Sequence, residues 1–464
     1  CQAIALDYHH RVTARRSSPP ISAIRWGRGL RLDAQPNGEF LQFTDADTEA
    51  RTSAQLELLW AEWCASADLT RQWHFDDIQQ IALGGMLILG DMLVLAVEDD
   101  LNEEQATFTT RLQLIEAQRI SNPNRAADTP TIAGGVERDE QGRVIAYHVC
   151  SGYPHGFGRT QLKQLEWQRI PLVSPNGKRH AYHVMDPLMT RPGQSRGIPL
   201  LVPVIAQLKQ LSDMTHAELT ASVLAACLAV FQETEDGGAS LPTAGGSDDR
   251  QGGKFALTDM EFQPGMVFEN MMPGEKVGSI ASNRPNTAFA AFESAIIAQI
   301  AAGTDLSKEV LTRHFQSSYS ASRGALGEVW RLFSRRRQIF SRFCQWSYEL
   351  MLDEVHDRNI MPLPNYATSR LHRRAWCQAQ WVGPPMPQMD EQKAVTAATK
   401  RVEAGFSSRK EETNKLTGGD FNRNHRQLER EQRLRDDAGL VGSPAIDRQA
   451  VQDDTILPNQ VDAE

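Results

Sequence analysis

The five-residue segment GQSRG, at residues 193–197, is the part of the sequence that most suggests catalysis. It matches the G-x-S-x-G turn that presents a nucleophilic serine between a strand and a helix of a large parallel sheet in α/β-hydrolases. Here Pro192 and Pro199 flank the segment, and the strands predicted before it form hairpins. Downstream aspartate and histidine partners cannot be assigned. We therefore expect an ordinary tight loop and keep a serine hydrolase that uses Ser195 as an alternative function.

A phosphate-binding loop is suggested by Gly253 and Lys254, but the surrounding residues do not fit it. The pattern G-x-x-x-x-G-K-[ST] requires a glycine where Asp248 stands and a hydroxyl residue where Phe255 stands. No strand is predicted to lead into this segment. ATP hydrolysis by this route is therefore excluded, and any ATP-driven motor that acts with this chain must be another protein.

Metal ligands are not predicted either. The candidates are three dipeptides of histidine or aspartate: His9-His10, Asp76-Asp77 and Asp248-Asp249. Adjacent carboxylates could suggest a two-metal nuclease site, but in polar segments without further ligands at a clear spacing they are more often solvated. The six cysteines contain no C-x-x-C pair, so zinc-site spacing is absent from the sequence. We expect no metal and no cofactor.

Three consecutive arginines, Arg335 to Arg337, lie within a long predicted helix. Adjacent residues point in different directions around a helix, so these three do not form one patch. We expect their stems to pack along the helix with exposed head groups. Contact with phosphate, or pairing between subunits, is the alternative.

The composition indicates a soluble protein of two to four domains. The chain has 464 residues, of which 41% are hydrophobic and 23% charged. Its net charge of -9 argues against a simple nucleic-acid binder, which is usually basic. No apolar run approaches the roughly 20 residues that span a bilayer, and the polar, basic residues 1–16 show no secretory signal. Because the first residue is not methionine, we expect a trimmed or processed chain of cytoplasmic origin with free thiols.

Hydrophobic spacing predicts a first region of helices and strands. Leu56, Leu59, Trp60 and Trp63 share one face of a helix over 54–65, and a second helix is predicted over 75–87. The period then changes to two, which is typical of strands, with a turn at residues 139–142. The predicted strands are residues 91–97, 111–115, 144–149 and 180–185.

After Pro199 the pattern becomes helical. A helix is predicted from Pro203 to about Gln232, and a second over 289–303. Between them, residues 233–276 are rich in turns and hold nine acidic against three basic residues. A polar loop, 304–319, leads into a helix over about 320–357, which would be roughly 55 Å long. Polar helices are predicted over 390–437.

Several segments, in the order in which they occur, resemble the lambda family of phage portal proteins. They are residues 114–120 (LIEAQRI), 132–139 (IAGGVERD), 142–149 (GRVIAYHV), 191–199 (RPGQSRGIP), a helical segment with an alanine-rich run at 213–231, and 300–303 with 319–326. The first four match the family patterns "IE-DRI", "GVE-D-GR-AYHV" and "PGQ-RG-P", and the last two flank its tunnel loop. The resemblance covers about residues 20–440. It departs at Gln118, where the family has an acidic residue, and over 304–311, where the family often reads "GVP-E-L".

The resemblance implies an α+β portal fold. Such a fold has a wing of sheet and helices, a helical stem, a small α/β clip, a long central helix and a helical crown. The implied regions are the N-terminal arm 1–53, first part of the wing 54–199, stem helix 200–232, clip 233–286, second stem helix 287–303, tunnel loop 304–319, long helix and second part of the wing 320–389, crown 390–440 and flexible tail 441–464.

It also implies a structural function without catalysis. Portal proteins form a ring, commonly of twelve subunits, at one vertex of the capsid, and double-stranded DNA passes through it during packaging and ejection. The implied location is the virion, after assembly in the host cytoplasm. The implied partners are further copies of the chain, the large terminase subunit, a head-completion or tail connector protein, the major capsid protein and double-stranded DNA, with no membrane. Another head-tail connector or scaffold component is a further alternative.

Two groups of site residues follow from the implied regions. In the tunnel loop we expect Lys308, Arg313 and His314 to face DNA, or equally to pair with neighbouring subunits, within a mostly acidic bore that repels phosphates. In the clip, an acidic surface would dock on a basic motor or connector surface. Its candidate residues are Glu233, Glu235, Asp236, Asp248, Asp249, Glu261 and Glu269.

Overall fold

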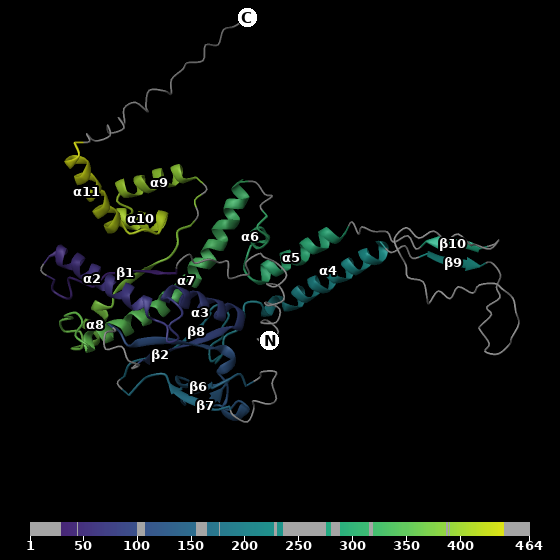
Figure 1. Ribbon diagram of the computed structural model, residues 1–464, viewed down its shortest axis with the longest axis horizontal. Coiled ribbons are helices and arrows are strands. Elements are labelled where there is room, and N and C mark those ends of the chain that lie inside the picture. Colours follow the sequence, from purple (N-terminus) through teal and green to yellow (C-terminus); the bar gives the residue numbers. More distant parts are fainter. Residues whose placement is uncertain are drawn as a thin grey trace, which may run out of the picture. The chain divides into compact units, whose positions relative to one another are not determined.

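The computed structural model describes residues 29–43, 45–99, 107–154, 165–175, 177–226, 230–234, 275–279, 288–314, 319–386, 388 and 390–439 (Figure 1). The chain divides into two compact units. Unit 1 comprises residues 1–20, 84–93 and 115–336, and unit 2 comprises 21–83, 94–114 and 337–464. Helices combined with small sheets give the α+β class that the sequence predicts.

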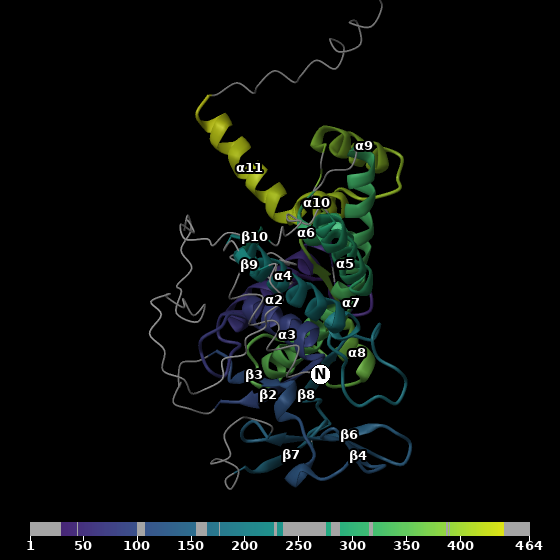
Figure 2. The ribbon, with the colours of Figure 1, turned by 90° about the vertical axis from the view of Figure 1, so that its right-hand side faces the viewer.

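A four-stranded antiparallel sheet forms one end of unit 1, in the order β4-β5-β6-β7 (Figure 2). Its strands are β4 (Ile132–Ala133), β5 (Val136–Arg138), β6 (Val144–Cys150) and β7 (Trp167–Pro171). Val136 pairs with Tyr147, and both are buried. At the turn between β5 and β6, the Gly142 N–H donates to the Asp139 carbonyl over 2.9 Å, which confirms the predicted turn.

A separate three-stranded sheet has the order β3-β2-β8. Its strands are β2 (Asp91–Glu98), β3 (Thr110–Glu116) and β8 (Ala181–Met185). Each lies within one residue of its predicted bounds. Two single-turn 3-10 helices follow β3, namely η2 (Ala117–Arg119) and η3 (Pro123–Arg125).

The helices of unit 1 follow the predicted pattern, except at the end of one helix and in the segment that forms α6. They are η5 (Val202–Val204), α4 (Ile205–Ala226), α5 (Phe289–Gly303), α6 (Lys308–Thr312) and the first half of α7 (Tyr319–Asp357). Helices α4 and α5 lie side by side (Figure 1). The prediction that the first long helix reaches Gln232 is wrong, because Val230–Thr234 forms strand β9. This strand pairs with β10 (Glu275–Ser279). Val230 and Phe231 favour strand structure once a partner strand is present.

The first described strand of unit 2 lies within the predicted N-terminal arm. Strand β1 (Arg31–Ala34) pairs antiparallel with β11 (Ala379–Val382), far along the chain. Leu30 and Leu32 are buried, so this short apolar stretch packs into the core beside a strand that is distant in the sequence. Helix α2 (Ala46–Ala65) starts eight residues before the predicted helix, because the Asp45 side chain accepts the Thr48 N–H and caps it. The N-terminal arm over 1–53 stays a prediction, and within it the structure describes β1 and the start of α2.

Aromatic side chains form the core of unit 2. Trp60 stacks on Trp63 with ring centroids 5.0 Å apart, and it meets Phe75 edge-on at 5.0 Å and Tyr348 at 5.7 Å. Phe75 in turn stacks on Phe343 at 5.8 Å. These residues come from α2, from the start of α3 (Phe75–Leu89) and from the second half of α7. Phe343 and Tyr348 are both buried, so the second half of α7 supplies part of this aromatic core.

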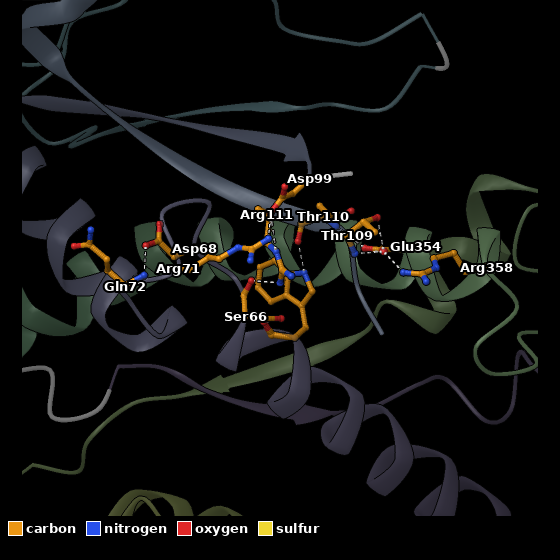
Figure 3. A network of polar contacts seen from close by, with 11 residues as sticks. Ser66, Asp68, Arg71, Gln72, Asp99, Thr109, Thr110, Arg111, Glu354 and Arg358 are labelled. Carbon is orange, nitrogen blue, oxygen red and sulfur yellow. Dashed lines mark hydrogen bonds and ion pairs between the residues drawn. The ribbon is translucent and has the colours of Figure 1, made fainter. Parts of the chain in front are cut away.

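Polar contacts stabilise the same unit where α7 meets the end of β2 and the start of β3 (Figure 3). The buried Glu354 carboxylate accepts the Thr109 N–H at 2.5 Å and the Thr110 N–H at 3.0 Å, and Arg358 donates to it at 3.1 Å. Nearby, Arg71 and Arg111 both contact Asp99. The backbone groups at the start of β3 are thus satisfied by a side chain from α7.

The C-terminal part of unit 2 is helical and polar. It contains α8 (Arg370–Trp376), α9 (Glu391–Glu403), α10 (Arg409–Thr417) and α11 (Phe421–Asp437). An aspartate or serine side chain caps the N-terminus of each, which is the residue type that helix starts favour. The helices predicted over 390–437 are confirmed.

Candidate functional site

The candidate site is the turn that joins α5 to α6 and leads toward α7, residues 303–314 of unit 1. Gly303 ends α5 against η5, and a Cβ atom at this position would collide with the Val204 side chain. Thr304 is buried, and its hydroxyl donates to the Ile300 carbonyl over 2.9 Å. The Leu306 N–H then returns to the Ala301 carbonyl over 2.9 Å. The chain therefore leaves α5 through a fixed turn rather than through an open loop.

A short helix follows within the segment that was predicted to be a polar loop. The Ser307 side chain accepts the Val310 N–H and starts α6. Lys308, its first residue, is half-buried, and its ammonium contacts the Ser294 hydroxyl on α5. Lys308 therefore ties α6 to α5, a role that the sequence pattern did not indicate.

Arg313 and His314 lie differently from Lys308. Arg313 ends α6 with a left-handed backbone (φ 55), and the His314 N–H donates to the Glu309 carbonyl over 3.1 Å. Both side chains are exposed, and neither forms an ion pair with a residue that the structure describes. The three predicted tunnel-loop cations therefore divide into one held by a neighbouring helix and two presented to the outside.

The arginine triplet is also divided. Arg335 is exposed, but Arg336 has only 3% of its surface exposed and its guanidinium lies 3.5 Å from the Asp186 carboxylate. Burial lowers the pKa of Arg336 below its ordinary value, and Asp186 opposes that shift. Arg337 donates to the Pro384 carbonyl within unit 2 over 2.6 Å. The expectation of three exposed head groups is thus wrong for Arg336, because a buried carboxylate pairs with it.

The GQSRG segment is a loop built around Arg196, not around Ser195. The Arg196 guanidinium forms a bidentate pair with the Asp91 carboxylate at 2.7 and 2.8 Å. It also donates to three backbone carbonyls, those of Ala117, Ile120 and Gly134. The Gly197 N–H adds a further bond to Asp91 over 2.8 Å. No strand-to-helix turn surrounds Ser195, so the nucleophile geometry of a hydrolase is absent.

Asp91 is the residue in this cluster that sequence reasoning missed. Its carboxylate is fully buried, and burial alone would raise its pKa. The hydrogen bonds from Arg196 and His183 outweigh that effect and hold its pKa well below the usual range. The signal available in the sequence was an aspartate at the start of an otherwise apolar strand, which demands a partner.

The predicted clip residues are mostly outside the described part of the chain. Glu233 lies in β9, opposite Lys276 of β10. The others, Glu235, Asp236, Asp248, Asp249, Glu261 and Glu269, lie outside the described residues.

The residues that the structure describes give no support for a bound cofactor or metal ion. They contain no group of three or more histidine, cysteine, aspartate or glutamate side chains that could hold a metal ion. Cys64, Cys150, Cys344 and Cys377 are buried as free thiols. Among the described helices, none combines the length and the apolar character that crossing a bilayer requires.

The amino-acid sequence of the chain matches a family of virion proteins. The family described as "Phage portal protein, lambda family" matches residues 25–337. The chain is 27% identical over 435 residues to the portal protein of Escherichia phage N15. The aligned region covers 89% of this chain and 80% of that protein. It is 26% identical over 436 residues to portal protein B of Escherichia phage lambda, which covers 89% and 79% respectively. The chain belongs to the lambda family of phage portal proteins.

Solved structures show a more distant likeness. The structure titled "Neck of native GTA particle computed with C12 symmetry" contains a chain with a TM-score of 0.41 and 11% identity, covering 85% of this chain and 97% of that one. A chain of "Virion of native gene transfer agent (GTA) particle" gives a TM-score of 0.37 and 13% identity, covering 86% and 94%. The predicted portal family is therefore confirmed by sequence, and the serine hydrolase alternative has no support.

Proposed function

We propose that this chain forms the portal ring of a phage head and that double-stranded DNA passes through the ring. Family membership supports this function, because the related proteins are portal proteins. The ring sits at one capsid vertex of the virion and is assembled in the host cytoplasm. It is a structural part, not an enzyme.

The observation that carries the ring is the uncovered face of α5. Its exposed positions, from Ala290 to Ala302, contain no charged side chain, and Phe292 has 48% of its surface exposed. On the neighbouring helix, Leu219 is 63% exposed. A helix that presents an uncharged face to water lacks the usual solvated side, and copies of the same chain packed around an axis would cover it.

The test is whether a charge on this face prevents ring formation. Ala295→Glu and Ala298→Glu place carboxylates on the exposed side of α5, so annular particles should be lost or strongly reduced. Ala61→Glu introduces the same change on an exposed position of α2 and is the matched control. Light scattering and negative-stain imaging of the purified proteins measure the outcome. If the unaltered chain stays monomeric, the ring proposal fails; if both α5 variants still form rings, this face is not the interface.

Within the ring, Arg313 and His314 face DNA. Both side chains are exposed and have no described ion-pair partner, which supports this assignment. Lys308 contacts Ser294 on α5, so we do not include it among the residues that face DNA. Two exposed cations per subunit on a chain of net charge -9 keep the contact with phosphate weak, so that DNA can slide.

The clip docks first on the large terminase subunit and later on the tail connector. The acidic balance of residues 233–276 supports an electrostatic contact with a basic partner surface. The major capsid protein contacts the ring at its vertex. A ring of twelve subunits is the state that we propose.

A further inference from the structure

Three arginines on the first half of α7 share one exposed side of the helix. Arg323, Arg331 and Arg335 are all exposed, and at 100° per residue they fall within about 120° of its circumference. They extend over roughly 18 Å of helix axis, at 1.5 Å per residue. We call this set the α7 arginine stripe.

The stripe has no ionic partner within the described residues. None of its three guanidinium groups pairs with a described carboxylate, although their neighbour Arg336 pairs with Asp186. Glu328, also exposed on α7, forms no ion pair with the stripe. The helix thus buries the arginine that has a partner and leaves these three in solvent.

This arrangement costs the isolated chain a little stability. Arg331 and Arg335 are four residues apart on a solvated helix, so their like charges repel each other, and Glu328, three residues before Arg331, offsets only part of that repulsion. An anionic partner outside the chain would convert the repulsion into attraction.

Exposed carboxylates are few on the described helices of unit 1: Asp213 on α4 and Glu328 on α7 are exposed, whereas Glu218, Glu293 and Glu309 are half-buried. The phosphate groups of a duplex match the stripe chemically. Arginine binds phosphate through two parallel N–H donors, α7 contains no lysine, and 18 Å is about half of one B-DNA turn.

We infer that the α7 arginine stripe contacts the phosphate backbone of double-stranded DNA without reading its sequence. The inference rests on the proposed portal function, and it extends the DNA-facing surface from Arg313 and His314 into the long helix. Phosphate contacts of this kind set the affinity and its dependence on salt. They would contact the passing duplex independently of its sequence, each contact being weak enough for the DNA to slide.

The test uses purified rings of the full chain and a fluorescently labelled 30-base-pair duplex, titrated from 50 to 200 mM salt. Rings of R331Q/R335Q should bind the duplex about tenfold more weakly, and the slope of log affinity against log salt should fall by about 1 to 2, since each lost phosphate contact removes about 0.9. R331K/R335K keeps the charges, so most of the slope should remain. Arg374→Gln, on an exposed position of α8, is the control and should leave both quantities unchanged.

The outcomes separate this inference from the proposed function. If R331Q/R335Q rings show the same affinity and slope as the unaltered rings, the stripe does not contact DNA. If the double variant loses its annular form while R374Q keeps it, the arginines contact a second copy instead, and the inference is again wrong. If the unaltered chain forms no ring, or its rings bind no duplex, the portal function itself fails. Arg313→Gln serves as the loop comparison in the same titration.

Discussion

Arg196 shows how a single side chain can organise a segment that contains no regular structure. Its guanidinium joins the start of β2 to the carbonyls after β3 and before β5, and Gly197 lets the backbone approach Gly90 so closely that no side chain would fit at either position. This explains the pattern "PGQ-RG-P" physically: arginine is required for the carboxylate and the carbonyls, and glycine for the close approach. The serine between them is incidental.

We therefore predict that Arg196→Ala strongly destabilises unit 1. The substitution leaves the buried Asp91 without its main partner, and breaking a buried ion pair in this way costs about 3–5 kcal/mol. Chemical denaturation followed by circular dichroism measures the loss. Arg191→Ala, at an exposed position of the same loop, should change stability by less than about 0.5 kcal/mol. Equal effects of the two variants would contradict the role given to Arg196.

Glu354 supports a second prediction at the scale of a residue. Burial tends to raise its pKa, but hydrogen bonds from Thr109, Thr110 and Arg358 lower it overall. A lowered pKa means that the stabilising contribution is fully present above the unfolded value of about 4.3 and is lost as pH falls through the folded value. Glu354→Gln should therefore lose about 1–3 kcal/mol at neutral pH.

The pH dependence distinguishes this effect from a general loss of packing. The difference in unfolding free energy between Glu354→Gln and the unaltered chain should shrink as the pH falls below the unfolded pKa of about 4.3 toward the lowered folded pKa, because the native carboxylate then becomes neutral too. Unfolding measured by denaturant at several pH values checks it. A difference that stays constant with pH would exclude the charge as the cause. Glu328→Gln, on an exposed position of α7, is the matched control.

At the scale of elements, the sequence predicts what depends on local periodicity. The helix predicted over 320–357 is α7 (Tyr319–Asp357), and the helix over 289–303 is α5. Both carry regular apolar stripes and have clear ends, so local sequence is sufficient. The four strands predicted from alternation correspond to β2, β3, β6 and β8, whereas β4, β5 and β7 were not predicted.

Elements that depend on distant partners were not predictable in this way. Strand β1 exists because β11, more than 340 residues later, pairs with it. Strand β9 replaces the expected end of a helix because β10 is available. Helix α6 spans five residues, too few for a periodic signal, and is defined by its Ser307 cap. The contact between Lys308 and Ser294 likewise depends on how two helices meet, which no spacing in the sequence records.

At the scale of the whole molecule, the charge of the chain is distributed unevenly. The stretch 233–276 contributes a balance of -6 to a total of -9, whereas the α7 arginine stripe is basic. A ring built from such subunits would repeat each of these charged surfaces once per copy. The acidic stretch can be identified from the sequence alone. The arginine stripe cannot, because only the exposed fraction of the side chain distinguishes Arg335 from its buried neighbour Arg336.

The four described thiols are buried, which makes it possible to follow the local unfolding of this protein by chemical labelling. Burial raises the pKa of Cys64 and Cys344 well above the usual value and that of Cys377 to about 12, so alkylating reagents should label them only after local unfolding. Cys150 lies in unit 1 and the other three lie in unit 2. Pulsed alkylation read by peptide mass spectrometry should thus time the opening of each unit separately within one sample. Rapid labelling of Cys344 in the native protein would show that the aromatic core unfolds locally far more often than its packing suggests.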